Sequence, residues 1–300
     1  MTSNLLLLIT AALWGFAFVA QSKGSQSMDA FSFNAIRFAL GAIFIRIALH
    51  KSFKKQSKLL WQPGLVLFIA ASLQQIGIIF TTAGSAGFIT GLYVLFVPLF
   101  GLFRKQIPGS RLVIAIALAL PGMYLINSTG GLRASFGNLL VLVSALFWAI
   151  HVQLVDKYSK LHSTGQLAFG QFAICALLSA LSALIWRFST SSTEVFSAAY
   201  FSGIAKAWLP ILYGGLISVG IAYTLQIKAQ QKAEPAAAAI IMCLEGVFAL
   251  LGSYLLLSEA VGLRSIFGAL LMLFAMILAS LPKKLVDRNR GSDLSAQTLS

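Results

Sequence analysis

The sequence predicts an all-α polytopic membrane protein with ten transmembrane helices. Its 300 residues are 58% hydrophobic and only 10% charged, whereas a soluble domain is about 25% charged. The apolar residues form runs close to the ~20 residues that a helix needs to cross a bilayer. A membrane β-barrel would instead show strands of about ten alternating apolar and polar residues, and the sequence has no such pattern.

Charged clusters bound the ten apolar runs. The uncharged stretch from Leu59 to Phe103 is too long for one crossing, so it must fold back at the break from Thr81 to Ser85. The first run resembles a secretory signal, but residues 1–4 lack the basic residues of such a signal, so we expect a retained helix. The predicted spans are residues 4–22, 31–50, 63–82, 86–103, 111–127, 137–155, 165–187, 208–227, 236–257 and 264–282.

The basic residues predict the orientation. The net charge is +14, but Lys and Arg lie between apolar runs rather than on one continuous face, which argues against nucleic-acid binding. Because basic loops stay in the cytoplasm, the side with fifteen basic residues, which carries both termini, is predicted to be cytoplasmic; the other side has five. The cytoplasmic set is Lys51, Lys54, Lys55, Lys58, Arg104, Lys105, Arg111, Lys157, Lys160, Lys228, Lys232, Lys283, Lys284, Arg288 and Arg290.

Three smaller features complete the predicted organisation. The external loop at 188–207 either lies along the outer membrane interface or forms a solvated linker. Residues 283–300 form a cytoplasmic tail. Cys175 and Cys243 both lie in apolar runs, so neither a disulfide nor a zinc site is expected. The loop residues at helical spacing are Val195, Phe196, Ala199 and Tyr200.

Short segments of the first half recur in the second. Two pairs of segments are 134 residues apart and a third pair is 148 apart, which a modest insertion explains. The sequence therefore predicts two five-helix units, residues 1–130 and 134–282. Because each unit crosses the membrane an odd number of times, the two would be inverted relative to each other, as in many secondary transporters. The pairs begin at Trp14 and Trp148, Arg37 and Gln171, and Phe96 and Leu244.

Several short motifs resemble the drug/metabolite transporter superfamily, in particular its EamA branch of ten-helix carriers. The resemblance covers nearly the whole chain. One difference is Gly246, where the family usually has a proline after the glutamate of the ninth helix. The motifs are Leu13-Trp14-Gly15, Ile36-Arg37-Phe38, Ala86 to Tyr93, Phe96-Val97-Pro98, Phe147 to His151, Ile221 to Gln226, Leu244 to Phe248 and Leu257-Ser258-Glu259.

The resemblance implies a carrier of small metabolites, with a central cavity between two helical bundles. Members of the family carry amino acids, nucleobases and drug-like compounds, often outward across the bacterial inner membrane. The implied partners are a small-molecule substrate, the lipid bilayer and, as coupling ions, protons. The carrier is expected to work as a monomer or a homodimer, without a cofactor.

Glu245, His151 and Arg37 lie deep in predicted spans. A central charged group costs about 2.5–3.5 kcal/mol on translocon scales, so each should face a water-filled path or a partner. Glu245 either binds a substrate amine or a proton, or only pins two helices. His151 either titrates in the site or bonds a neighbouring helix as a neutral ring; no ligand spacing suggests a metal. For Arg37 a structural or gating role is favoured over substrate contact, and Pro98 is expected to kink its helix.

The remaining candidates mix hydrogen-bonding and aromatic side chains, which suits an amphipathic small molecule. Single aromatic residues more often pack or anchor a helix at the interface, so only the paired placement of Trp14 and Trp148 marks them. The complete set of candidate substrate-binding residues is Trp14, Gln74, Gln75, Tyr93, Trp148, His151, Gln171, Tyr223 and Glu245.

Three classes of function compete. A secondary transporter, driven by the substrate gradient or by protons, is favoured because the chain lacks the nucleotide-binding G-x-x-x-x-G-K-[ST] loop. Export is expected, with proton-coupled import as the alternative. An intramembrane enzyme needs paired catalytic groups, and no Ser/Lys, Asp/Asp or H-E-x-x-H set occurs in the spans. A membrane sensor or scaffold normally has a soluble output domain, and no such domain is expected here.

The basic loops give a testable topology. Reporter fusions placed after Lys58, Arg104, Lys160, Lys232 and Lys284 should all report the cytoplasm, because each follows a predicted cytoplasmic cluster. Alkaline phosphatase and green fluorescent protein fusions measure this directly. A periplasmic signal at two or more of these sites would contradict the ten-helix topology.

Overall fold

The computed structural model describes residues 2–53, 60–127, 136–190, 196–258 and 262–280. Within these ranges all regular structure is helical and no strand occurs. The predicted all-α polytopic class is therefore confirmed. The predicted tail at 283–300 and Val195 lie outside the described residues.

Eight helical segments among the described residues are long and apolar enough to cross a membrane. Five are continuous helices: α1 Ser3–Ser25, α2 Ala30–Ala48, α3 Trp61–Ile79, α7 Phe136–Ser159 and α8 Thr164–Thr190. Three are composite: α4 Ala83–Gly91 with α5 Tyr93–Leu102, α10 Trp208–Leu212 with the π-helix η2 Tyr213–Ala222 and α11 Tyr223–Gln230, and α12 Pro235–Met242 with α13 Glu245–Leu257.

Two further apolar helices are α6, Ser110–Asn127, and α14, Leu263–Ser280. Within their described residues, Ser110–Gly122 and Ile266–Leu278 are apolar stretches shorter than the eight segments above. The eight longer segments match eight of the ten predicted spans, and the complete ten-span count stays a prediction. The short elements are η1, His50–Ser52, and α9, Ala198–Lys206.

Helix α9 lies in the loop that the sequence predicts to be external. It begins after Ser197, whose hydroxyl accepts a hydrogen bond from the Tyr200 amide at 3.3 Å. Tyr200 packs against Phe196 and Phe201, and the Arg187 guanidinium lies 4.1 Å from its ring centre. The segment therefore forms a short helix rather than an irregular linker.

The predicted hairpin between the third and fourth spans is confirmed. Helix α3 ends at Ile79 and α4 begins at Ala83. The Thr82 hydroxyl caps α4 by accepting a hydrogen bond from the Ser85 amide at 3.1 Å. A threonine at this position satisfies an amide that the first helical turn leaves free, so the break is encoded locally.

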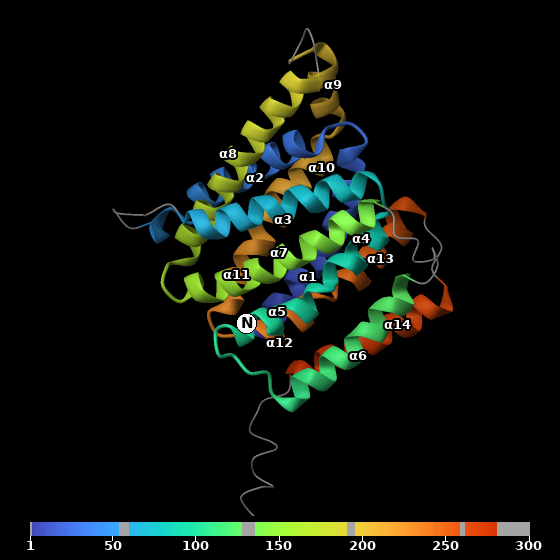
Figure 1. The fold of residues 1–300 in the computed structure, drawn as a ribbon. Helices are drawn as coiled ribbons and strands as arrows, with labels where there is room; N and C mark the ends of the chain where they lie inside the picture. The colour runs from blue at the N-terminus through green and yellow to red at the C-terminus, as the bar shows by residue number, and fades with distance from the viewer. Residues whose placement is uncertain (1, 54–59, 128–135, 191–195, 259–261, 281–300) are drawn as a thin grey trace, which may run out of the picture.

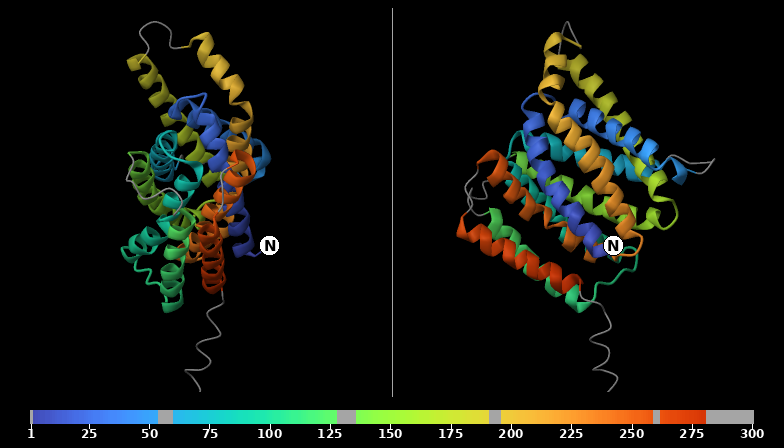
Figure 2. Two further views of the ribbon diagram at one scale, coloured as in Figure 1. Left: turned by 90° about the vertical axis from the view of Figure 1, so that its right-hand side faces the viewer. Right: turned by 180° about the vertical axis from the view of Figure 1, so that it is seen from behind.

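The helices pack across the two halves of the chain (Figure 1). Helix α2 pairs with α8, α3 with α7, α1 with α13, and α6 with α14. The α6–α14 pair lies at the edge of the bundle and reaches the remainder chiefly through α4, α12 and α13, and Figure 2 shows it at one end of the molecule in both views. The central helices are therefore those that can enclose a site.

Two composite spans are interrupted at corresponding points. Helix α4 gives way to α5 at Leu92, and α12 gives way to α13 at Cys243 and Leu244. Their starts are separated by the same number of residues, 152 from Ala83 to Pro235 and 152 from Tyr93 to Glu245. This spacing differs by four residues from the 148-residue offset between Phe96 and Leu244.

Glycines allow α3 and α7 to approach closely. A Cβ atom at Gly77 would lie 2.8 Å from the Gly137 carbonyl oxygen and 2.6 Å from Cγ2 of Val141. In the reverse direction, a Cβ atom at Gly137 would lie 2.7 Å from the Gly77 oxygen. Small residues are typical of such contacts in membranes.

We therefore expect Gly77→Ala to destabilise the protein by about 1–3 kcal/mol, because the added methyl group must push two backbones apart. The thermal unfolding midpoint of the purified protein in detergent measures the effect. Gly109→Ala is the matched control, because a Cβ atom there would have no neighbour within 4 Å. Equal midpoints for both variants would show that the helix contact is looser than the structure indicates.

Candidate functional site

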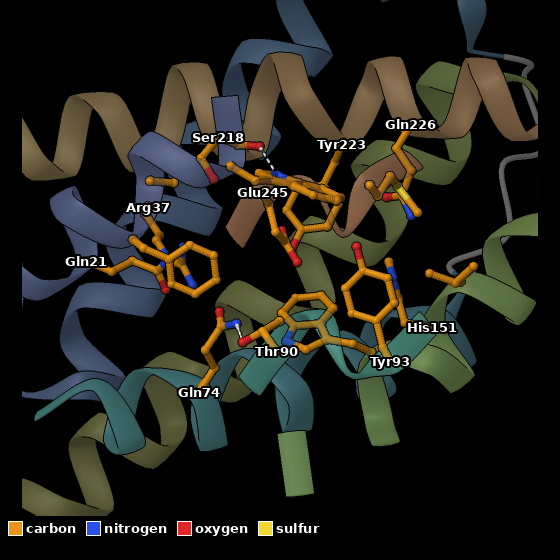
Figure 3. Close-up of a pocket in the computed structure, with 16 residues that line it drawn as sticks. Gln21, Arg37, Gln74, Thr90, Tyr93, His151, Ser218, Tyr223, Gln226 and Glu245 are labelled. Carbon is orange, nitrogen blue, oxygen red and sulfur yellow. Dashed lines mark hydrogen bonds between the residues drawn. The ribbon is translucent and has the colours of Figure 1, made fainter. Parts of the chain in front are cut away.

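A cavity of about 40 Å³ lies where the broken helices meet α1, α2, α3 and α7 (Figure 3). Most of the candidate residues line it: Trp14, Gln74, Tyr93, Trp148, His151, Tyr223 and Glu245. Arg37, which was expected to be structural or to act in gating, lines the same cavity. Gln75, Gln171 and Pro98 do not contribute to its lining.

Tyr223 is the centre of an aromatic cluster. Its ring centre lies 4.6 Å from that of Trp14, 6.2 Å from that of Trp148 and 6.0 Å from that of His151. The Trp14 and His151 rings are in edge-to-face orientation to it, which is a favourable geometry for aromatic pairs. The two tryptophans that the sequence relates thus contact a common third ring.

The π-helix η2 is bonded to α1. The Trp14 Nε1–H group donates to the backbone carbonyl oxygen of Ser218 at 3.2 Å, and the Tyr213 hydroxyl donates to the backbone carbonyl oxygen of Leu13 at 2.9 Å. The Thr10 hydroxyl also lies 3.3 Å from the Ala222 oxygen. π-Helical segments are rare and frequently occur at functional sites. Here, the segment provides backbone oxygens that orient one wall of the cavity.

Glu245 and Tyr93 are the first residues of α13 and α5, at the two helix breaks. Both are buried, with exposed fractions of 3%. The Glu245 carboxyl and the Tyr93 hydroxyl interact with each other, and the Glu245 Oε1 atom and the Tyr93 hydroxyl have no other hydrogen-bond partner among the described residues. A helix start favours negative charge because its amides point outward. The site therefore presents two polar groups that a ligand can satisfy.

Three amide side chains have fixed partners. Gln74 donates to the Thr90 hydroxyl at 2.9 Å, inside the cavity. Gln75 points away from it and ties α3 to α1 through the Ser25 hydroxyl at 2.7 Å. Gln171 lies behind the wall, where its Oε1 atom is 2.9 Å from Nε2 of His151. His151 therefore lines the cavity and also bonds a neighbouring helix, so the two expected roles are not exclusive.

Pro98 lies inside α5, away from the cavity, beside a buried polar cluster. The Gln153 amide donates to the Val97 oxygen at 2.9 Å. Asp156, whose side chain is fully buried, pairs with Arg104 at 3.1 Å and Lys160 at 2.6 Å. Asp156 follows directly after the predicted span at 137–155 and was not among the predicted site residues. The structure shows that it joins α7 to the end of α5.

The sequence analysis also missed several polar lining residues. Helical spacing from recognised residues could have found them, since side chains three, four or seven positions apart share a face. Gln21 follows Trp14 by seven positions, and Gln226 follows Tyr223 by three. The missed polar residues are Gln21, Thr90, Ser218 and Gln226.

Comparisons with known proteins agree with this architecture. The sequence model of the EamA-like transporter family matches residues 1–128 and 135–281. An uncharacterized transporter of Archaeoglobus fulgidus is 32% identical over 93% of this chain and 86% of its own length. The uncharacterized transporter YoaV of Bacillus subtilis is 24% identical over 87% of this chain and 90% of its own.

A solved structure described as a crystal structure of a protein has the same fold. It superimposes with a TM-score of 0.74 over 93% of this chain and 96% of its own, at 18% identity. The family match covers nearly all residues, and the archaeal relative shares about a third of its aligned positions. The chain therefore belongs to the EamA-like transporter family.

Proposed function

We propose that this membrane transporter is a secondary carrier that exports a small metabolite across the bacterial inner membrane by alternating access. The observation that carries the proposal is the cavity at the two helix breaks, lined by the polar groups of Glu245 and Tyr93, which interact with each other and with no other described residue. Discontinuous helices form the substrate sites of many secondary transporters, because their ends offer polar backbone groups within the membrane.

The proposal includes ten spans arranged as two inverted five-helix repeats, with α6 and α14 as the fifth and tenth. The pairing of helices supports it, because each contact between the halves has a counterpart when every helix is replaced by its repeat partner. The counterpart of the α3–α7 contact is the contact of α1 with η2 and α11. The counterpart of the α1–α13 contact is the contact of α7 with α4 and α5. The family model matches two separate stretches. With ten spans, the basic loops and both termini lie in the cytoplasm.

The size of the cavity supports a conformational change. Its volume of about 40 Å³ compares with about 10–15 Å³ for one water in the same measure, so it holds a few waters and no metabolite. Substrate binding therefore requires the surrounding helices to separate. Ion pairs at opposite ends of the bundle can hold this contracted state: Arg104–Asp156 at 3.1 Å and Arg187–Asp29 at 3.6 Å.

The proposed transporting unit is the monomer, with a homodimer as the alternative. Glu245 can exchange a proton as well as a substrate group, and proton coupling in either direction is the second candidate mechanism. An export and resistance screen in cells that overproduce the chain identifies the substrate used below.

Cysteine labelling tests whether the cavity is reached by water. In a background with Cys175 and Cys243 replaced by alanine, Trp14→Cys and Trp148→Cys should react with a membrane-impermeant thiol reagent, because opening of the carrier hydrates both positions. Leu177→Cys is the control, since Leu177 is 60% exposed on the outer surface of α8. Labelling of the tryptophan positions no faster than the control would indicate that both residues only pack between helices.

Glu245→Gln tests the centre of the proposed site. The change keeps the size of the side chain and removes its charge, so we expect transport to fall by at least about tenfold, the equivalent of 1.4 kcal/mol, with unfolding temperature little changed. Transport by purified protein in liposomes measures the rate, and Glu234→Gln, outside the cavity, is the control. Transport at the wild-type rate would assign Glu245 to helix packing alone.

A further inference from the structure

Arg37 is a buried cation held in a fixed position. Its side chain comes from α2 and is part of a residue that is only 3% exposed. The Nε–H group donates to the Asn34 Oδ1 atom at 2.9 Å, and the Asn34 amide in turn donates to the Ala71 oxygen at 3.1 Å. The guanidinium carbon lies 4.8 Å from the ring centre of Phe38 and 5.7 Å from that of Phe33.

The part of the chain that the structure describes supplies no anion for Arg37. The ion pairs in this part of the chain involve Asp156 and Asp29, and neither of these residues pairs with Arg37. Glu245 lines the same cavity but forms no ion pair with it. A buried charge without a counter-charge is costly. A neutral amide from Asn34 offsets only part of this cost.

We propose that Arg37 binds the carboxylate of a small organic acid, which is the transported substrate. The proposal rests on the proposed function and assigns a substrate class to its cavity. A guanidinium has five N–H donors, and only the Nε–H group is bonded to the protein in the structure. Its planar fork matches a carboxylate and forms two parallel hydrogen bonds with it.

The charge and shape of the cavity favour a monocarboxylate. Arg37 is the only Lys or Arg side chain among the described residues that line it, so it can neutralise one negative charge of a ligand when Glu245 is protonated. A phosphate monoester carries about −1.5 to −2 charges at neutral pH and would remain partly uncompensated. Trp14, Phe18 and Trp148 supply apolar surface around the remainder of the cavity. The substrate is therefore a monocarboxylic acid with an apolar body.

Binding and thermal unfolding of the purified protein in detergent test this assignment. The probes are acetate, benzoate and phenylacetate, each compared with its neutral amide: acetamide, benzamide and phenylacetamide. We expect at least one carboxylate to bind and to raise the unfolding temperature, while its amide does not. Absence of binding by every carboxylate, or equal binding of acid and amide, overturns the proposal.

Variants separate an anion-binding role from a structural one. Arg37→Gln should reduce carboxylate affinity by at least about tenfold, because charge-assisted hydrogen bonds are lost, while the unfolding temperature without ligand stays equal or rises. Arg46→Gln is the matched control: Arg46 is exposed on the same helix, with its guanidinium carbon 4.7 Å from the Phe53 ring centre. Undiminished carboxylate binding by Arg37→Gln overturns the proposal.

Arg37→Lys covers the case in which Arg37→Gln does not fold. It keeps the charge but loses the planar fork, so weaker carboxylate binding supports the assignment and unchanged binding contradicts it. Transport in liposomes is measured separately. Carboxylate binding without any transport would reject the transport function and keep the anion site. Transport of an uncharged substrate without carboxylate binding would reject the anion site and keep the transport function.

Discussion

Polar side chains inside an apolar bundle must bond to the protein or face enclosed water, because hydrocarbon offers neither donors nor acceptors. Four of the eight buried amide side chains among the described residues obey this constraint by donating to backbone oxygens of other helices. These hydrogen bonds hold the helices in position without a bound substrate. Such pairs are Asn34 to Ala71, Gln75 to Gln21, Gln153 to Val97 and Gln230 to Val152. The exceptions that matter for function, Arg37, Tyr93 and Glu245, share one cavity.

Helix breaks and close packing explain why these exceptions meet. The breaks at Leu92 and at Cys243–Leu244 place Tyr93 and Glu245 at the starts of half-helices inside the bundle. Glycines bring the neighbouring backbones near enough to enclose these residues. For example, a Cβ atom at Gly15 would lie 2.8 Å from the backbone oxygen of Glu245. The positions of the site residues thus depend on backbone features that carry no functional groups.

The sequence predicted the spans well because length and hydropathy are local properties. The predicted span at 236–257, for example, differs by one residue at its start from Pro235–Leu257. Depth within the spans also singled out Glu245, His151 and Arg37, and all three line the cavity. The direction in which each side chain points within the bundle was not predictable. Gln74 and Gln75 are adjacent in the sequence, yet only Gln74 lines the cavity. The π-helix at Tyr213–Ala222 had no sequence signal that the analysis used, and it orients Trp14 through the Ser218 oxygen.

Arg37 forms no ion pair within the described residues, so its burial in the cavity is costly without a ligand. A ligand shifts a conformational equilibrium only by the difference in its affinity for the two states. An acid that neutralises Arg37 contributes such a difference, because the gain is largest where the guanidinium is enclosed and shielded from water. In the proposed mechanism, the charge of Arg37 therefore couples substrate binding to closure of the helices around it.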